Sequence, residues 1–159
     1  MWEASRRHIG SGTLPDQPPG RWRYFVMLKL EIVTPEKRIV DTEADSVTVP
    51  TASGEAGILP NHAPLISALK PGVLTYSDRG GTERIAIGGG FVEVNSDKVS
   101  VLADTAETAD EINAEQARLE RDAAEKAIAE AIQRPVEETE DLRERLESAN
   151  ARLQLAAGK

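Results

Sequence analysis

Few side chains in this chain of 159 residues could make or break bonds. There is no Cys, which excludes thiolate catalysis, disulfides and Cys-based metal sites. Of the two His, His8 and His62, the second lies in the proline-flanked segment 59–65, Leu-Pro-Asn-His-Ala-Pro-Leu. A His general base needs a nucleophile and an orienting partner, and this segment offers neither. We expect a fixed loop that shapes a docking surface; a small hydrolase built on His62 is the alternative.

The glycine run Gly88-Gly89-Gly90 is similar to a phosphate-binding loop. Such a loop precedes a helix, whose first N–H groups face the anion, but here an alternating Phe-Val-Glu-Val follows. The run therefore predicts a tight bend or bulge between strands. The acidic run 137–141 lacks the spacing of a calcium loop and indicates a solvated helix start. The sequence predicts no metal site.

Three arginines near the C-terminus could recognise a charged group. Arg145 and Arg152 are seven residues apart and so share one face of a helix, and Arg143 lies close by. A guanidinium binds carboxylates through two parallel hydrogen bonds. Two interpretations stay open, namely ion pairs within the helix and contact with an acidic partner.

The segment that holds His62 and the glycine run has the composition of a β domain. Residues 27–106 contain eight of the twelve Gly and five of the nine Pro, and apolar and polar residues alternate in short runs. Period-two alternation indicates strands buried on one face, and turn signals at 78–81 and 95–97 join neighbouring runs. Eight to ten short strands predict an all-β domain, a β-sandwich of about ten strands.

The arginines belong to a segment, residues 107–159, with helix composition: twelve Ala, one Pro and no aromatic residue. Thr108 with Glu111 forms a capping-box pattern, and Asp110 is a second cap candidate. Two apolar stripes flank Pro135: Ile112, Leu119, Ala123, Ala127, Ile128 and Ala131 before it, and Leu142, Leu146, Ala149 and Leu153 after it. We expect an antiparallel α-helical hairpin. Because buried alanines contribute little, the hairpin should dock weakly and be movable, and a partner's surface that covers the stripe is the alternative.

Residues 1–26 form a third segment, without periodicity, that holds both Trp and three Pro. They predict a disordered extension, either a flexible arm or residues upstream of a translation start at Met27. The net charge of −8 argues against nucleic-acid binding, because phosphate neutralisation needs basic surface. No run of 18 apolar residues could span a membrane.

Two stretches of the β segment match a known family in order and spacing. The first is 54–65, Gly-Glu-Ala-Gly-Ile-Leu-Pro-Asn-His-Ala-Pro-Leu, followed by Leu-Lys-Pro-Gly at 69–72. The second is Gly-Gly-Phe-Val-Glu-Val at 89–94, followed by Val-Ser-Val-Leu-Ala-Asp-Thr-Ala at 99–106. In these stretches the chain resembles the epsilon subunit of F-type ATP synthase, which is equivalent to the mitochondrial delta subunit.

The resemblance implies a noncatalytic rotor subunit in the central stalk of a proton-translocating ATP synthase, without a cofactor. The β domain would bind the gamma subunit on one side and the membrane rotor ring on another. Ser53, Gly54, Glu55 and His62 would face the ring. Asn61 replaces a common Gly, and Asn also tolerates left-handed backbone. The subunit would be peripheral, on the cytoplasmic face of the bacterial plasma membrane, without insertion.

For the helical hairpin the resemblance implies regulation. Compact against the β domain, it would permit turnover. Extended along gamma into the head of alpha and beta subunits, it would block ATP hydrolysis. Arg143, Arg145 and Arg152 would then meet an acidic segment of the beta subunit.

Some relatives hold the hairpin compact by binding ATP through the motif Ile/Leu-Asp-x-x-Arg-Ala. This chain has Ile112 and Ala117 at the outer positions, but Asn113 and Gln116 replace the Asp and the Arg. Loss of the Arg removes a charge-assisted phosphate contact. We therefore expect weak or absent ATP binding, and an ATP-sensing module is the alternative to a stalk subunit.

Overall fold

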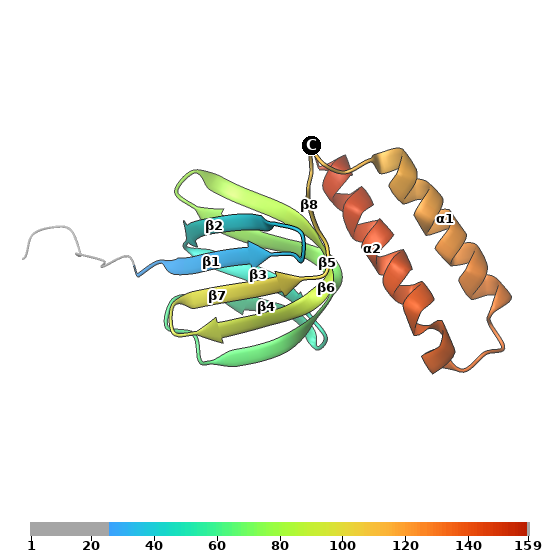
Figure 1. The fold of residues 1–159 in the computed structure, drawn as a ribbon, viewed down its shortest axis with the longest axis horizontal. Coiled ribbons are helices and arrows are strands. Elements are labelled where there is room, and N and C mark those ends of the chain that lie inside the picture. Colours follow the sequence, from blue (N-terminus) through green and yellow to red (C-terminus); the bar gives the residue numbers. More distant parts are fainter. Residues whose placement is uncertain (1–25, 159) are drawn as a thin grey trace, which may run out of the picture.

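The structure is a computed structural model that describes residues 26–158 of the chain. The predicted extension at 1–26 lies outside the described residues except for Val26. Figure 1 shows a β-sandwich followed by two helices packed on one side of it. The elements are β1 (Leu28–Val33), β2 (Arg38–Ala44), β3 (Ser46–Thr51), β4 (Gly54–Ile58), β5 (Leu65–Asp78), β6 (Gly81–Asn95), β7 (Lys98–Ala103), β8 (Ala106–Thr108), α1 (Ala114–Glu130), the 3-10 helix η1 (Val136–Thr139) and α2 (Glu140–Ala157).

The described strands form one folded sheet in the order β2-β1-β7-β6-β5-β3-β4, with β8 paired to β6. Their pairing is antiparallel except between β1 and β7, which run parallel. The alternation seen in the sequence puts Leu28, Leu30 and Ile32 of β1 into a core of aliphatic side chains from every long strand. The predicted class, a β-sandwich followed by a helical hairpin, is confirmed.

Residues 26–158 form eight strands, because two pairs of alternating runs that look separate in the sequence are fused. The runs at 65–69 and 73–77 are both part of β5, and those at 83–87 and 91–95 are both part of β6. The glycine run therefore lies within β6 and not between strands. Gly89 and Gly90 have φ of 113° and 121°, so the strand bends there and continues into the other layer of the sandwich.

The first helix begins later than the capping-box pattern predicted. Asn113 is the N-cap of α1, and its Oδ1 accepts a hydrogen bond from the Gln116 N–H at 3.0 Å. Glu111 does accept hydrogen bonds from the backbone and hydroxyl of Thr108, but this closes a turn between β8 and α1. The predictions of a cap at Thr108 or Asp110 were wrong.

The helical hairpin is compact, and α2 lies between the sheet and α1 (Figure 1). The α1 residues that are buried are alanines, Ala117 and Ala124. The predicted stripe was displaced, because Leu119 and Ala123 are exposed. On α2, Ala151 and Leu155 are buried beside the predicted seam residue Ala149, so this helix packs on two sides. No helix in residues 26–158 is long and apolar enough to cross a membrane.

Candidate functional site

The predicted ring-facing residues Ser53, Gly54 and Glu55 form the exposed turn from β3 into β4. Thr51 fixes this turn, since its hydroxyl donates to the Gly54 carbonyl at 2.6 Å and accepts from the Ser53 N–H at 3.3 Å. Gly54 has φ of 117°, a backbone conformation that favours glycine. The turn is therefore a rigid projection at the edge of the sheet.

His62 lies in the loop between β4 and β5, which is held by backbone contacts. Its ring Nδ1 lies 2.7 Å from the Ala63 carbonyl oxygen, so Nδ1 carries the proton and donates. Asn61 has φ of 63°, and its N–H donates to Asp97 Oδ1, in the β6–β7 turn, at 2.9 Å. The ring thus serves to shape the loop. Among the described residues no group of three or more His or acidic side chains could hold a metal ion.

The structure separates the predicted ring-facing residues into two places. The Ser53–Glu55 turn includes the first two residues of β4, whereas His62 follows the strand, whose five residues span about 13 Å. The turn lies beside β5, where the Ala52 N–H donates to the Ala68 carbonyl at 3.0 Å, whereas the loop lies beside the β6–β7 turn. The edge strand β4 joins them.

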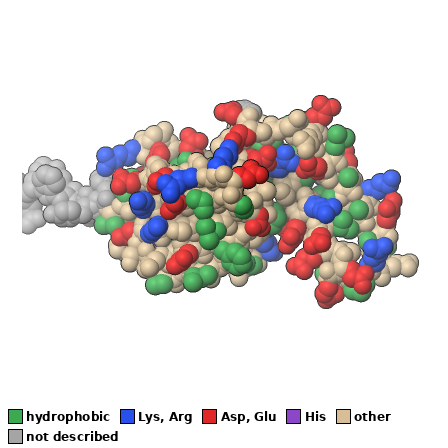
Figure 2. Space-filling view, in the orientation of Figure 1, with side chains coloured by type: hydrophobic (Ala, Val, Ile, Leu, Met, Phe, Trp, Pro, Cys, Tyr) green, Lys and Arg blue, Asp and Glu red, His purple; other side chains and the backbone are tan. Residues whose placement is uncertain are grey.

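An apolar row crosses the outer face of four strands, formed by Val33, Leu102, Phe91 and Ala68. Phe91 and Leu102 are each 59% exposed. Figure 2 shows hydrophobic side chains gathered on this front of the sandwich. The sequence analysis did not predict this row, although the alternation within β6 indicates it. Because Val92 and Val94 point into the core, Phe91, which directly precedes Val92, faces outward.

The two halves of β6 differ in what covers their outer face. In the first half Ile85, Ala86 and Ile87 are all buried, because α2 covers the side to which Ala86 points. In the second half burial alternates and the outer face is open. The apolar row is therefore a sheet face that the hairpin leaves uncovered.

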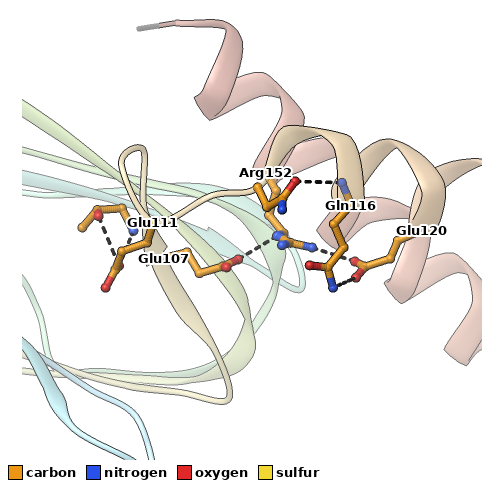
Figure 3. A network of polar contacts seen from close by, with 7 residues as sticks. Glu107, Glu111, Gln116, Glu120 and Arg152 are labelled. Atoms are coloured by element: carbon orange, nitrogen blue, oxygen red, sulfur yellow. Dashed lines mark hydrogen bonds and ion pairs between the residues drawn. The ribbon is translucent and has the colours of Figure 1, made fainter.

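Of the three predicted arginines, Arg152 is the least exposed. Its side chain is 13% exposed and makes ion pairs with Glu107 of β8 and Glu120 of α1 (Figure 3). A cleft of about 430 Å³ opens beside it, lined on its far side by the β1–β2 turn. Arg143 and Arg145 are exposed. Arg143 faces a groove shared with Lys70 of β5, and Arg145 one between the helices.

The residues that interrupt the ATP-binding motif have structural contacts of their own. Asn113 caps α1, and the Gln116 side-chain amide donates to Glu120 Oε1 at 3.0 Å (Figure 3). The matching positions are buried: Ile112 packs with Ala86 and Leu155, and Ala117 faces α2. Gln116 and Glu120 thus extend the contacts of Arg152 along α1.

The connection between β8 and α1 is fixed by Glu111. Its Oε1 lies 2.9 Å from the Lys37 Nζ in the β1–β2 turn. The Thr108 N–H, followed by the Lys37 ammonium and the Thr108 hydroxyl, lowers the pKa of Glu111 from 4.5 to about 2. A carboxylate therefore ties the start of the hairpin to the β domain.

Comparison with known proteins agrees with this architecture. A family model described as ATP synthase, Delta/Epsilon chain, beta-sandwich domain matches residues 27–109. The ATP synthase epsilon chain of Herpetosiphon aurantiacus is 45% identical over 135 residues, covering 81% of this chain and 93% of that one. The epsilon chain of Desulfitobacterium hafniense strain Y51 is 46% identical over 99 residues, covering 62% and 75%.

A solved structure extends the likeness to the helices. A chain of the Euglena gracilis mitochondrial ATP synthase, solved as OSCP, F1 and c-ring, superimposes with a TM-score of 0.67 at 25% identity. The match covers 90% of this chain and 89% of that one. The hydrolase alternative is thereby overturned, and the predicted resemblance is confirmed. The chain belongs to the delta/epsilon family of ATP synthase, as an epsilon chain, a noncatalytic subunit of the central stalk.

Proposed function

We propose that this subunit links gamma to the membrane rotor ring and so couples proton flow to ATP synthesis. It acts as a peripheral protein on the cytoplasmic face of the bacterial plasma membrane. The observation that carries the proposal is the apolar row, an uncovered sheet face in a subunit of a multi-chain stalk. Exposed apolar faces of this kind mark protein interfaces.

Gamma is the partner proposed for the apolar row. Phe91 is its largest side chain, and large aromatic residues at the centre of an interface contribute most of the binding energy. The Phe91→Glu variant should therefore bind gamma at least about 30-fold more weakly in co-purification and titration. Leu119→Glu likewise replaces an exposed apolar side chain with Glu, but on α1, and should bind as the wild type does. Equal binding by both variants would contradict the assignment.

The rotor ring is the partner proposed for the edge strand β4. Strand β4 pairs with β3, and its exposed turn and the His62 loop lie at its two ends. A ring surface along this edge would meet Ser53, Gly54 and Glu55 at one end and His62 at the other. Because the chain has no Cys, Glu55→Cys and Ala63→Cys can each carry a photo-crosslinker. Both should crosslink to the ring, and crosslinking at one end alone would restrict the interface to that end.

The hairpin is proposed to inhibit ATP hydrolysis when it leaves the compact state. In the extended form Arg143, Arg145 and Arg152 would meet an acidic segment of the beta subunit, within the head that alpha and beta form. ATP is proposed to bind weakly or not at all, since Asn113 and Gln116 have structural contacts in place of the motif's Asp and Arg. Direct titration with ATP separates this from the ATP-sensing alternative, which requires tight binding.

A further inference from the structure

One guanidinium joins three elements of the compact molecule. Arg152 of α2 has its Nε 2.7 Å from Glu107 Oε2 on β8, and its Nη1 2.6 Å from Glu120 Oε2 on α1. Figure 3 shows Arg152 between the two carboxylates. Since β8 belongs to the sheet, these two pairs connect each helix to the β domain through a single side chain.

The pair with Glu120 is the better aligned of the two. Glu120 is held from both sides, because its Oε1 accepts from Gln116 and its Oε2 from Arg152. The Nε–H of Arg152 is buried without a well-directed hydrogen bond, although its nitrogen is within ion-pair distance of Glu107. The Arg152–Glu107 contact is therefore mainly a charge–charge attraction. Removal of the Glu107 carboxylate would leave the largely shielded Arg152 guanidinium incompletely neutralised.

The apolar contact between the hairpin and the sheet is small and sits beside these charges. The contact of α2 with the sheet buries a small cluster, Ala86, Ile112 and Leu155. The contact of α1 with α2 buries alanines, which remove little apolar area from water. An arginine that is 13% exposed and paired twice thus adds to this apolar cluster a charged contact that only the compact hairpin makes.

We propose that Glu107, Glu120 and Arg152 form a latch that holds the hairpin compact through the chain's own side chains. The latch opens when a carboxylate of a partner replaces Glu107 and Glu120 at the Arg152 guanidinium. The exchange deepens the proposed function, since it identifies the step at which the hairpin becomes free to extend. The latch itself concerns this chain alone, so it can be tested without the other subunits.

The test measures hairpin release in the isolated full chain. Lys70 and Glu144 line the same groove between β5 and α2. Spin labels on Lys70→Cys and Glu144→Cys should therefore give a short distance in the compact state. Arg152→Gln should raise the population at long distances about tenfold. Lys126→Gln, which removes one positive charge from the exposed face of α1, should leave the distribution unchanged.

A double-mutant cycle isolates the pair itself. Glu107→Gln, which removes the pair between α2 and the sheet, should also release the hairpin, and the Glu107→Gln, Arg152→Gln double variant should be no more released than Arg152→Gln alone. The matched change Glu125→Gln should have no effect and should add nothing to Arg152→Gln. Equal long-distance populations in Arg152→Gln and Lys126→Gln would overturn the latch.

Two measurements separate release from misfolding. Protection of the β-core amides from hydrogen exchange should be unchanged in each variant, because the core consists of strand residues. Arg152→Lys keeps the charge but cannot reach two carboxylates as a fork, so it should give a released population between those of wild type and Arg152→Gln. A released population in Arg152→Lys equal to that of wild type would show that a single point charge suffices and would overturn the three-residue latch. The two proposals fail independently. A negative spin-label result would contradict the latch but not the binding of gamma by the apolar row, and unchanged gamma binding by Phe91→Glu would contradict the apolar row but not the latch.

Discussion

At the scale of single residues, polar side chains in this molecule fix the junctions between its elements. Glu111 ties the β1–β2 turn to the segment before α1, and Asn113 begins the helix. Asp97 holds the backbone of the His62 loop. The roles of Glu111 and Asp97 could not be predicted from the sequence, because they depend on turns that are distant along the chain but adjacent in the fold.

The depressed pKa of Glu111 makes its contribution to folding depend on pH. A carboxyl with a lowered folded-state pKa stabilises fully above its unfolded value, here 4.5, and loses that effect as pH falls toward about 2. Glu111→Gln should therefore lower the free energy of unfolding at pH 7, by about 1 kcal/mol or less given its exposure. At pH 3 the difference in unfolding free energy between Glu111→Gln and wild type should be smaller. Urea unfolding at the two pH values measures it.

Thr108→Ala is the matched control for this prediction. It removes the hydroxyl donor but keeps the Thr108 N–H, the largest cause of the shift. The variant should therefore retain most of the pH dependence that Glu111→Gln loses. A gap between wild type and Glu111→Gln that is the same at pH 3 and pH 7 would contradict the assignment.

Gly90 should tolerate no side chain. Its φ is 121°, and a Cβ there would lie 2.0 Å from the Leu102 carbonyl oxygen on β7. Gly81 has a similar φ of 129° with no atom within 4 Å. Gly81→Ala should lower the free energy of unfolding by the backbone strain alone, about 1–3 kcal/mol. Gly90→Ala adds a steric clash and should lower it by more than about 4 kcal/mol. Equal losses in urea unfolding would show that β7 moves aside freely.

At the scale of elements, periodicity predicted which faces are buried better than it predicted where elements end. The alternation of β1 and of Val92 and Val94 matches the core, since packing and period-two geometry impose the same pattern. The continuity of β5 and β6 was missed, because glycines and a proline at the bend imitate turn signals. The displaced stripe of α1 has a similar cause: Leu119 is apolar but exposed, and small alanines make the contact.

Leu155 tests how α2 is attached to the sheet. It is 4% exposed and packs with Ala86 and Ile112. Leu155→Ala should cost about 2–5 kcal/mol of docking free energy, so the α2 amides should exchange hydrogen faster while the β-core amides keep their protection. Leu119→Ala, at a position 66% exposed, should change the opening free energy of the α2 amides, measured by hydrogen exchange, by less than about 0.5 kcal/mol. Loss of protection in both elements together would mean that they unfold as one unit.

At the scale of the whole molecule, the hairpin can be separated from the β domain. Among the described residues the main core consists of strand side chains alone. Deletion of residues 110–159, which keeps β8, should therefore leave a cooperatively folded domain that binds gamma. If the hairpin inhibits, the reconstituted head should hydrolyse ATP faster with this deletion than with the full chain. Rates that are equal across ATP concentrations would exclude the regulatory role and leave the stalk role intact.

The continuity of β5 and β6 has a mechanical consequence. The two strands pair along nearly their whole length, from Leu65 with Val94 to Asp78 with Gly81, and each passes through both layers. A sandwich whose layers were joined by loops could shear along the plane between them. Here a twisting load that enters at the His62 loop, next to Leu65, is carried by covalent backbone across that plane to the surface on which α2 rests. The domain should respond to torque as a single stiff body.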